Sequence, residues 1–167
     1  MRRVYYWLQS PPFWIGLTVG YTFLILFFCF RPQIPNPDLP TPGVFYRGRL
    51  AFLLTPLNSL WNLNQATSFM HLLTILLQNA LNIFLLYPLL LGILVLQPNF
   101  RTLHKIVWLG FYLSLSIELG QLLLDYLWDF NRVFEIDDLW TNTLGAYLAY
   151  RTYLWLEKRQ VLPTPTK

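Results

Sequence analysis

The sequence predicts an all-α, polytopic membrane protein with four transmembrane helices and both termini in the cytoplasm. No Asp, Glu, Lys or Arg occurs in the 51 residues between Arg49 and Arg101. Hydrophobic residues make up 55% of the chain and charged residues only 12%, against roughly 25% charged residues in soluble domains. About 20 apolar residues suffice to cross the ~30 Å hydrocarbon core of a bilayer. The 167 residues allow one membrane domain.

Four apolar segments have the length and hydropathy of membrane spans. Their predicted boundaries are residues 13–30, 72–96, 105–124 and 139–156. Pro88 lies inside the second segment, where a proline should kink the helix. The third segment contains Glu118, and the fourth contains Arg151 near its end.

A long outer loop, residues 31–71, is expected between the first two spans. Its first part is rich in proline, which predicts an extended and stiff chain. Residues 50–61 are apolar but interrupted by Pro56 and Asn58. We therefore interpret them as a segment that lies in the outer interface or dips into it.

Positive charge predicts the orientation of the bundle. With the N-terminus inside, eight of the twelve Lys and Arg residues fall on the cytoplasmic side, which is the side where they are enriched in membrane proteins. These charges are dispersed around apolar segments and do not form a basic patch, so no nucleic-acid partner is predicted. Membrane lipids are the first partners that the sequence predicts.

Glu118 is the residue that most needs an explanation. An ionised carboxylate inside a span costs at least ~2.5 kcal/mol even on insertion-based scales, so its side chain should face a polar interior. Ser114 lies four residues before it and Gln121 three residues after it, which places all three on one helix face. Its position in the span predicts a depth of ~10 Å below the outer end.

Neighbouring helices offer polar partners at a similar depth. Asn142 lies about one turn inside the fourth span, and Asn79 and Asn82 share a face of the second. The short link between the third and fourth spans makes them antiparallel neighbours, and Arg132 in that link is the natural counter-ion for Glu118. Two simpler interpretations remain open: buried amides that only join helices by hydrogen bonds, and an arginine that is only a solvated loop residue.

Asp137 and Asp138 open the fourth helix. One acid at a helix start is explained by capping and by the helix dipole, but a second acid, with Glu135 nearby, exceeds that need. Such a cluster suits a basic ligand or a divalent cation, although no spacing here is diagnostic of Mg²⁺ or Ca²⁺. Cys29 is the only cysteine, and no Cys/His cluster suggests zinc. No metal and no cofactor is predicted.

The run from Ser114 to Tyr150 resembles the signature of the VanZ-like family. The family pattern is a span ending in Glu-x-x-Gln, a loop with Arg, then Asp-Asp followed by Asn-x-x-Gly in the next span. In this chain these positions are Glu118, Gln121, Arg132, Asp137, Asp138, Asn142 and Gly145. Asn82 and Pro88 also resemble the family's second helix, although the Pro-Leu-Gly run usual there is lengthened here.

The resemblance implies a multi-pass protein of the bacterial cytoplasmic membrane, similar to proteins that confer low-level teicoplanin resistance. With the outward polar cluster, it favours binding of a cell-envelope component or lipid headgroup, and a lipid-linked envelope precursor is an expected partner. Two alternatives remain open. One is a non-catalytic subunit or assembly factor of a larger membrane complex. The other is an intramembrane enzyme acting on a lipid-linked substrate, with Glu118 or Asp138 as general acid or base.

Overall fold

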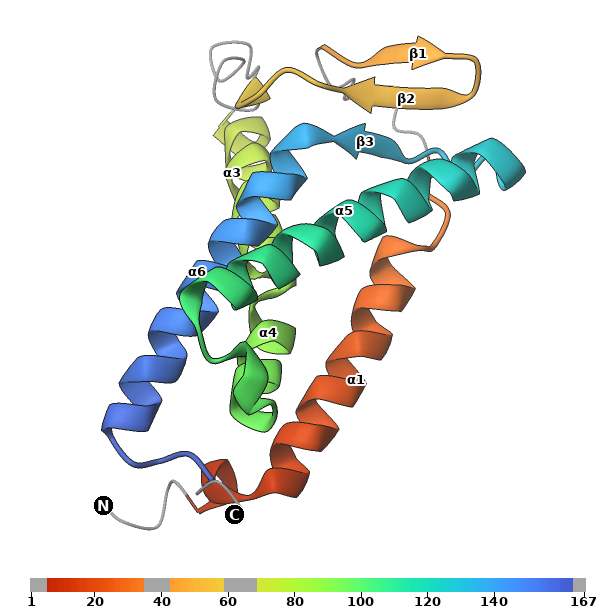
Figure 1. Ribbon diagram of the computed structural model, residues 1–167. Coiled ribbons are helices and arrows are strands. Elements are labelled where there is room, and N and C mark those ends of the chain that lie inside the picture. The colour runs from red at the N-terminus through yellow and green to blue at the C-terminus, as the bar shows by residue number, and fades with distance from the viewer. Residues whose placement is uncertain (1–5, 35–42, 59–68, 164–167) are drawn as a thin grey trace.

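The computed structural model describes residues 6–34, 43–58 and 69–163, and these parts are mostly helical (Figure 1). The α-helices are α1 (Pro11–Cys29), α3 (Phe69–Leu85), α4 (Tyr87–Leu96), α5 (Leu103–Trp128) and α6 (Ile136–Lys158). Short 3-10 turns are η2 (Trp7–Gln9) and η4 (Pro98–Phe100). The strands are β1 (Phe45–Arg47), β2 (Leu50–Leu53) and β3 (Val133–Glu135). The mainly helical prediction is confirmed, but the small sheet corrects the all-α expectation.

Three helical stretches within the described ranges are long and apolar enough to cross a membrane: Pro11–Cys29, Leu77–Leu96 and Leu103–Trp128. The second of these is interrupted between α3 and α4, where Pro88 occupies the first turn of α4 and its missing N–H leaves no helical hydrogen bond unmade. The third stretch continues past residue 124, the predicted end. Asp125, expected in an outer loop, therefore lies in α5.

Helix α6 packs against α3, α4 and α5, while α1 packs against α4 on the other side (Figure 1). Two glycines permit these close contacts. A Cβ atom on Gly145 would collide with the main-chain carbonyl of Ile83 on α3. A Cβ atom on Gly110 of α5 would lie 2.6 Å from that of Ala146. Any side chain at either glycine would push α6 away from its neighbours.

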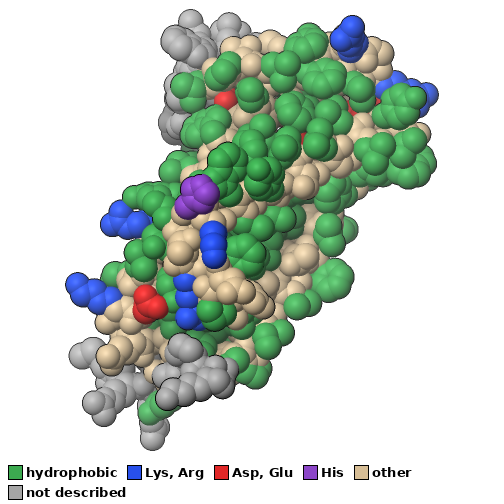
Figure 2. All heavy atoms as spheres, in the orientation of Figure 1, with side chains coloured by type: hydrophobic (Ala, Val, Ile, Leu, Met, Phe, Trp, Pro, Cys, Tyr) green, Lys and Arg blue, Asp and Glu red, His purple; other side chains and the backbone are tan. Residues whose placement is uncertain are grey.

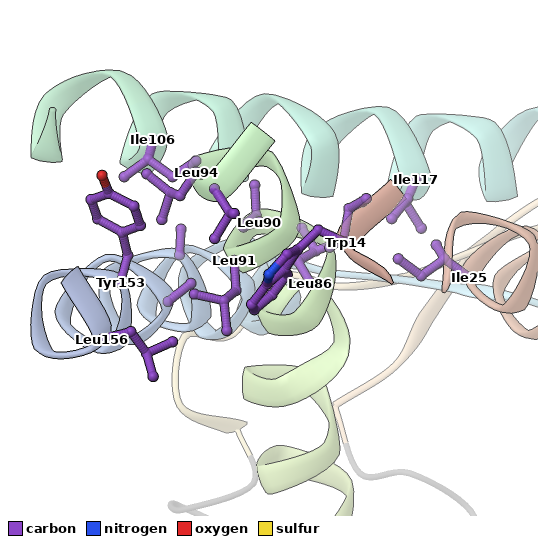
Figure 3. Packing of buried hydrophobic residues seen from close by; sticks show 14 of the residues in the cluster. Trp14, Ile25, Leu86, Leu90, Leu91, Leu94, Ile106, Ile117, Tyr153 and Leu156 are labelled. Atoms are coloured by element: carbon purple, nitrogen blue, oxygen red, sulfur yellow. The ribbon is translucent and has the colours of Figure 1, made fainter. Parts of the chain in front are cut away.

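An apolar core fills the space where α1, α4, α5 and α6 meet (Figure 3). Leu86, Leu90 and Leu94 have no exposed surface and form its centre. Arg101 closes the end of α4, because its Nε donates to the carbonyl of Leu94 at 3.0 Å and its Nη2 to that of Val95 at 2.8 Å. Cations are favourable at helix C-termini, where carbonyl groups lack helical partners.

The sheet covers the ends of α5 and α6 (Figure 1). β1 and β2 form an antiparallel hairpin, and β2 pairs in parallel with β3, which runs directly into α6. Gly48 opens the two-residue turn with φ of 66°, as a tight hairpin requires. Within the segment predicted to lie in the outer interface, Leu50–Leu53 form strand β2, and its place at the interface stays a prediction. Residues 59–61 lie outside the described ranges.

Candidate functional site

Glu118 on α5 and Asp138 in the first turn of α6 form the centre of the site. Their carboxyl groups lie within hydrogen-bonding reach of each other, and a hydrogen bond between them requires one proton because an ionised carboxylate only accepts. The side-chain amide of Asn82 on α3 donates to Oδ1 of Asp138. Glu118 is only 2% exposed, and its Oε2 accepts the main-chain N–H of Glu135 at 3.0 Å. Three helices and β3 therefore converge on this acid pair.

A polar seam between α5 and α6 continues from the acid pair. Nδ2 of Asn142 donates to Oγ of Ser114 at 2.9 Å, and that hydroxyl donates to the main-chain carbonyl of Asp138 at 3.0 Å. Asn142 is 1% exposed, and its Oδ1 has no hydrogen-bond partner within the described residues. A buried polar group left unsatisfied costs about 1–3 kcal/mol. A hydrogen-bond donor that reaches this oxygen would therefore remove that cost.

Asp137, although adjacent to Asp138, holds a different part of the chain. Its Oδ1 accepts the N–H of Leu57 at 2.7 Å and the indole N–H of Trp140 at 2.8 Å, and its Oδ2 accepts the N–H of Asn58 at 3.0 Å. Leu57 has φ of 57°, in the left-handed region that leucine rarely adopts. Asp137 is thus an anchor for the turn that follows β2, and it needs no ligand to explain its burial.

Arg132 is buried, but its guanidinium group turns to the end of α1. Nη2 donates to the carbonyl of Phe28 at 2.7 Å and to that of Arg31 at 2.9 Å, and Nε donates to the latter at 3.1 Å. The direct ion pair expected with Glu118 does not form, and Arg132 acts on that carboxyl only through its charge. Burial lowers the pKa of Arg132 from its ordinary value.

Gln121 and Asp125 belong to the same junction between α1 and α5. Nε2 of Gln121 donates to the carbonyl of Cys29 at 2.9 Å. Oδ1 of Asp125 accepts the N–H of Arg132 at 2.8 Å, whereas its buried Oδ2 has no partner in the part of the chain described. The residues predicted for the site therefore fall into three groups: the acid pair with its amides, the Asp137 anchor, and this α1 junction.

Glu135 is a site residue that the sequence argument did not select, although its place just before the two aspartates was a signal. It ends β3, and its main chain reaches Glu118. Burial, followed by the negative charges of Asp138 and Asp137, raises the pKa of Glu135 to about 7. Among the described residues, no group of three or more His, Cys, Asp or Glu side chains is arranged to hold a metal ion.

Comparison with known proteins assigns the family. No curated protein and no solved structure matches the chain. The VanZ/LLP1 family model matches residues 18–157, a region that contains the acid pair, its amides and the junction with α1. Since this region is most of the 167-residue chain, the protein belongs to the VanZ/LLP1 family.

Proposed function

We propose that this protein is a VanZ-like protein of the bacterial inner membrane that binds an amine-bearing cell-envelope component at the Glu118–Asp138 pair. The observation that carries the proposal is the close approach of two carboxyl groups, those of Glu118 and Asp138, within a helix bundle. Hydrogen bonds between amides or hydroxyls can join helices in membranes without burying a charge, whereas a buried carboxyl is costly unless it is neutral or paired. The acid pair therefore suggests a task beyond helix association.

An ammonium group matches the chemistry of this pair. Two carboxyl groups that share one proton can release it and bind a cation, because charge-assisted hydrogen bonds then replace the shared one. Asn142, one turn beyond Asp138 on α6, adds an acceptor oxygen that has no partner among the described residues. Asp138 and Asn82 are partly exposed while Glu118 is buried, so the ligand would enter between α3 and α6. Amine-bearing lipid headgroups and lipid-linked envelope precursors both carry this chemistry.

We further propose four spans, with the acid pair toward the outer face. Nε2 of Gln9 donates to the carbonyl of Gln160 at 3.3 Å, so the two ends of the described chain meet at one end of the bundle. Ends on the same side require an even number of crossings, and α6 supplies the fourth. Its 23 residues span about 35 Å at 1.5 Å per residue, and Asp137, Thr141 and Asn142 in its first half are buried against its neighbours.

Teicoplanin susceptibility tests the proposal in cells. A susceptible bacterial host that expresses the wild-type chain should gain resistance, and Glu118→Gln and Asp138→Asn should each remove it at an unchanged amount of membrane protein. Asp129→Asn is the matched control: Asp129 is exposed at the end of α5 with φ of 60°, a conformation that asparagine tolerates. Equal loss of protein and of resistance would make the acid pair structural and overturn the proposal.

Calorimetry tests the binding step itself. Purified protein in nanodiscs is titrated with a lipid-linked, amine-bearing peptidoglycan precursor in two buffers with different ionisation enthalpies. If an ammonium replaces the shared proton, the measured heat should differ between buffers in proportion to the protons released. A heat that is independent of the buffer, or binding that survives Glu118→Gln, would contradict the proposed site.

A second candidate function, assembly with other membrane subunits, is favoured by α1. Added Cβ atoms on Gly16 and Gly20 would meet nothing within 4 Å among the described residues, so none of these packs closely on this Gly-x-x-x-Gly face. Such faces bring transmembrane helices into close contact. Gly16→Leu should abolish a stoichiometric partner or dimer on mild-detergent chromatography if this function holds, and a wild-type monomer would argue against it.

A further inference from the structure

A groove lies between the α3–α4 corner and α6, away from the acid pair. It has a volume of about 500 Å³, is open to the surface, and is lined by Phe84, Tyr87, Leu148, Arg151, Thr152 and Trp155. Its lining is mainly apolar and aromatic, with one cation. Figure 2 shows that Lys and Arg side chains gather over the lower half of the face displayed, where α6 ends in Figure 1. The groove therefore lies at the more basic end of the bundle.

Arg151 is the distinctive residue of this groove. Its side chain is exposed, and Nη1 donates to the hydroxyl of Tyr147 at 2.7 Å. Its guanidinium carbon lies 5.8 Å from the centre of the same tyrosine ring. Among the described residues no carboxylate pairs with Arg151. A guanidinium group has five N–H donors, so most of its hydrogen-bonding capacity remains for an acceptor from outside the protein.

The depth of Arg151 suits a phospholipid phosphate. Arg151 is about two turns, or ~10 Å, before the end of α6 at Lys158. In the structure its guanidinium group lies against Tyr147, one turn nearer the start of α6, and the flexible side chain of an arginine at this depth can extend along the helix to bring its charge to the membrane interface. Trp155 lies one turn beyond Arg151, and tryptophan is enriched at the membrane interface. Thr152 accepts a hydrogen bond from the hydroxyl of Tyr87 at 2.9 Å, so its own hydroxyl can donate to a phosphate oxygen.

We propose that this groove is a binding site for an anionic phospholipid, with Arg151 and Thr152 on the headgroup phosphate and one acyl chain against Phe84, Leu148 and Trp155. Charge selects the anionic class. Among the residues described, Arg151 is the one cation that lines the groove, and basic pockets between transmembrane helices favour acidic headgroups. A zwitterionic lipid would bring an ammonium group toward this cation. The site takes a different headgroup charge from the acid pair and lies further along α6, near its opposite end, so neither proposal depends on the other.

Native mass spectrometry of the full chain tests the proposal. Protein in mild detergent is titrated with palmitoyl-oleoyl phosphatidylglycerol or with the matching phosphatidylcholine. The wild type should retain one phosphatidylglycerol about tenfold more readily than phosphatidylcholine, as expected for one charge-assisted contact. Arg151→Gln should remove this preference, whereas Lys158→Gln, which deletes the same charge at the same helix end, should keep most of it.

A second variant separates the groove from its charge. Leu148→Trp fills the apolar part of the groove and retains Arg151, so it should also reduce lipid retention. The proposal is overturned if Arg151→Gln retains the preference, or if Lys158→Gln lowers it as much, since the effect would then be general surface charge. Should either groove variant fail to fold, bromine-labelled phosphatidylglycerol added to the wild type must quench tryptophan fluorescence more than the matched phosphatidylcholine. Equal quenching would also refute the site.

Discussion

The two adjacent aspartates at the start of α6 should differ strongly in how much stability the same isosteric change to asparagine removes. Asp137→Asn removes the charge that accepts three N–H groups, from Leu57, Asn58 and Trp140. An amide keeps one acceptor oxygen and turns its own N–H₂ group toward a donor, so at least one hydrogen bond is lost. Asp138→Asn instead keeps the contact with Asn82 and gives the pair a permanent donor.

The expected magnitudes follow from these contacts. A hydrogen bond to a charged group contributes about 1.5–3 kcal/mol, and Leu57 loses the group that holds its left-handed conformation. Asp137→Asn should therefore lower the free energy of unfolding by about 2–4 kcal/mol, or the melting midpoint by roughly 5–10 °C. Asp138→Asn should leave the midpoint within about 2 °C of the wild type, because it replaces a shared proton by an amide donor.

The chain provides its own reporter for this measurement. Cys29 is the only cysteine and is 6% exposed, so a thiol-reactive fluorescent dye reports unfolding as that side chain becomes accessible. Melting curves of both variants are recorded in the same detergent, with Asp129→Asn as the charge control. Equal midpoints for Asp137→Asn and the wild type, or a larger loss for Asp138→Asn, would refute the separation of an anchoring acid from a binding acid.

Three further changes are predicted. Gly145→Ala should lower the free energy of unfolding by about 1–3 kcal/mol, because its methyl group overlaps the carbonyl of Ile83, while Gly16→Ala, with open space, should cost nothing in the same thermal assay. Arg132→Gln should cost about 1.5–3 kcal/mol through its lost bonds at the end of α1, again read from the melting midpoint. Burial raises the pKa of Glu135 to about 7, so the stability that its protonated form contributes is fully present below the unfolded-state pKa of ~4.3 and is lost as pH rises through 7. The melting midpoint of the wild type should therefore decrease from pH 5 to pH 8. The decrease should be smaller in Glu135→Gln, which cannot ionise at this position.

Hydropathy was enough to locate the helices because each apolar segment is long and interrupted by few charges. The sheet was missed because its strands have only three or four residues, and β2 pairs with β3 about 80 positions away in the chain. The hairpin had a local signal: Gly48 stands between the aromatic end of β1 and the apolar β2, a pattern typical of a tight turn between strands. The pairing with β3 had none.

Helical spacing alone put Ser114 with Glu118, and Asp138 with Asn142, on common faces, and in the structure these four residues line one seam. The roles of Arg132 and Asp137 could not be obtained in this way. Both depend on where a distant segment of main chain lies, and main-chain partners carry no sequence signal.

The two aspartates differ because successive helical residues point about 100° apart. Asp138 shares its face with Asn142 and turns to the seam of α3 and α5, whereas Asp137 turns to the segment after β2. The first turn of α6 thus anchors the segment that follows β2 through Asp137, and it also supplies Asp138, the acid that a ligand would contact. Since the anchor's bonds go to main-chain N–H groups, replacing Leu57 or Asn58 need not disturb it, whereas replacing Asp137 must. The two adjacent aspartates therefore have separate roles, and the direction in which each side chain leaves the helix decides which role it has.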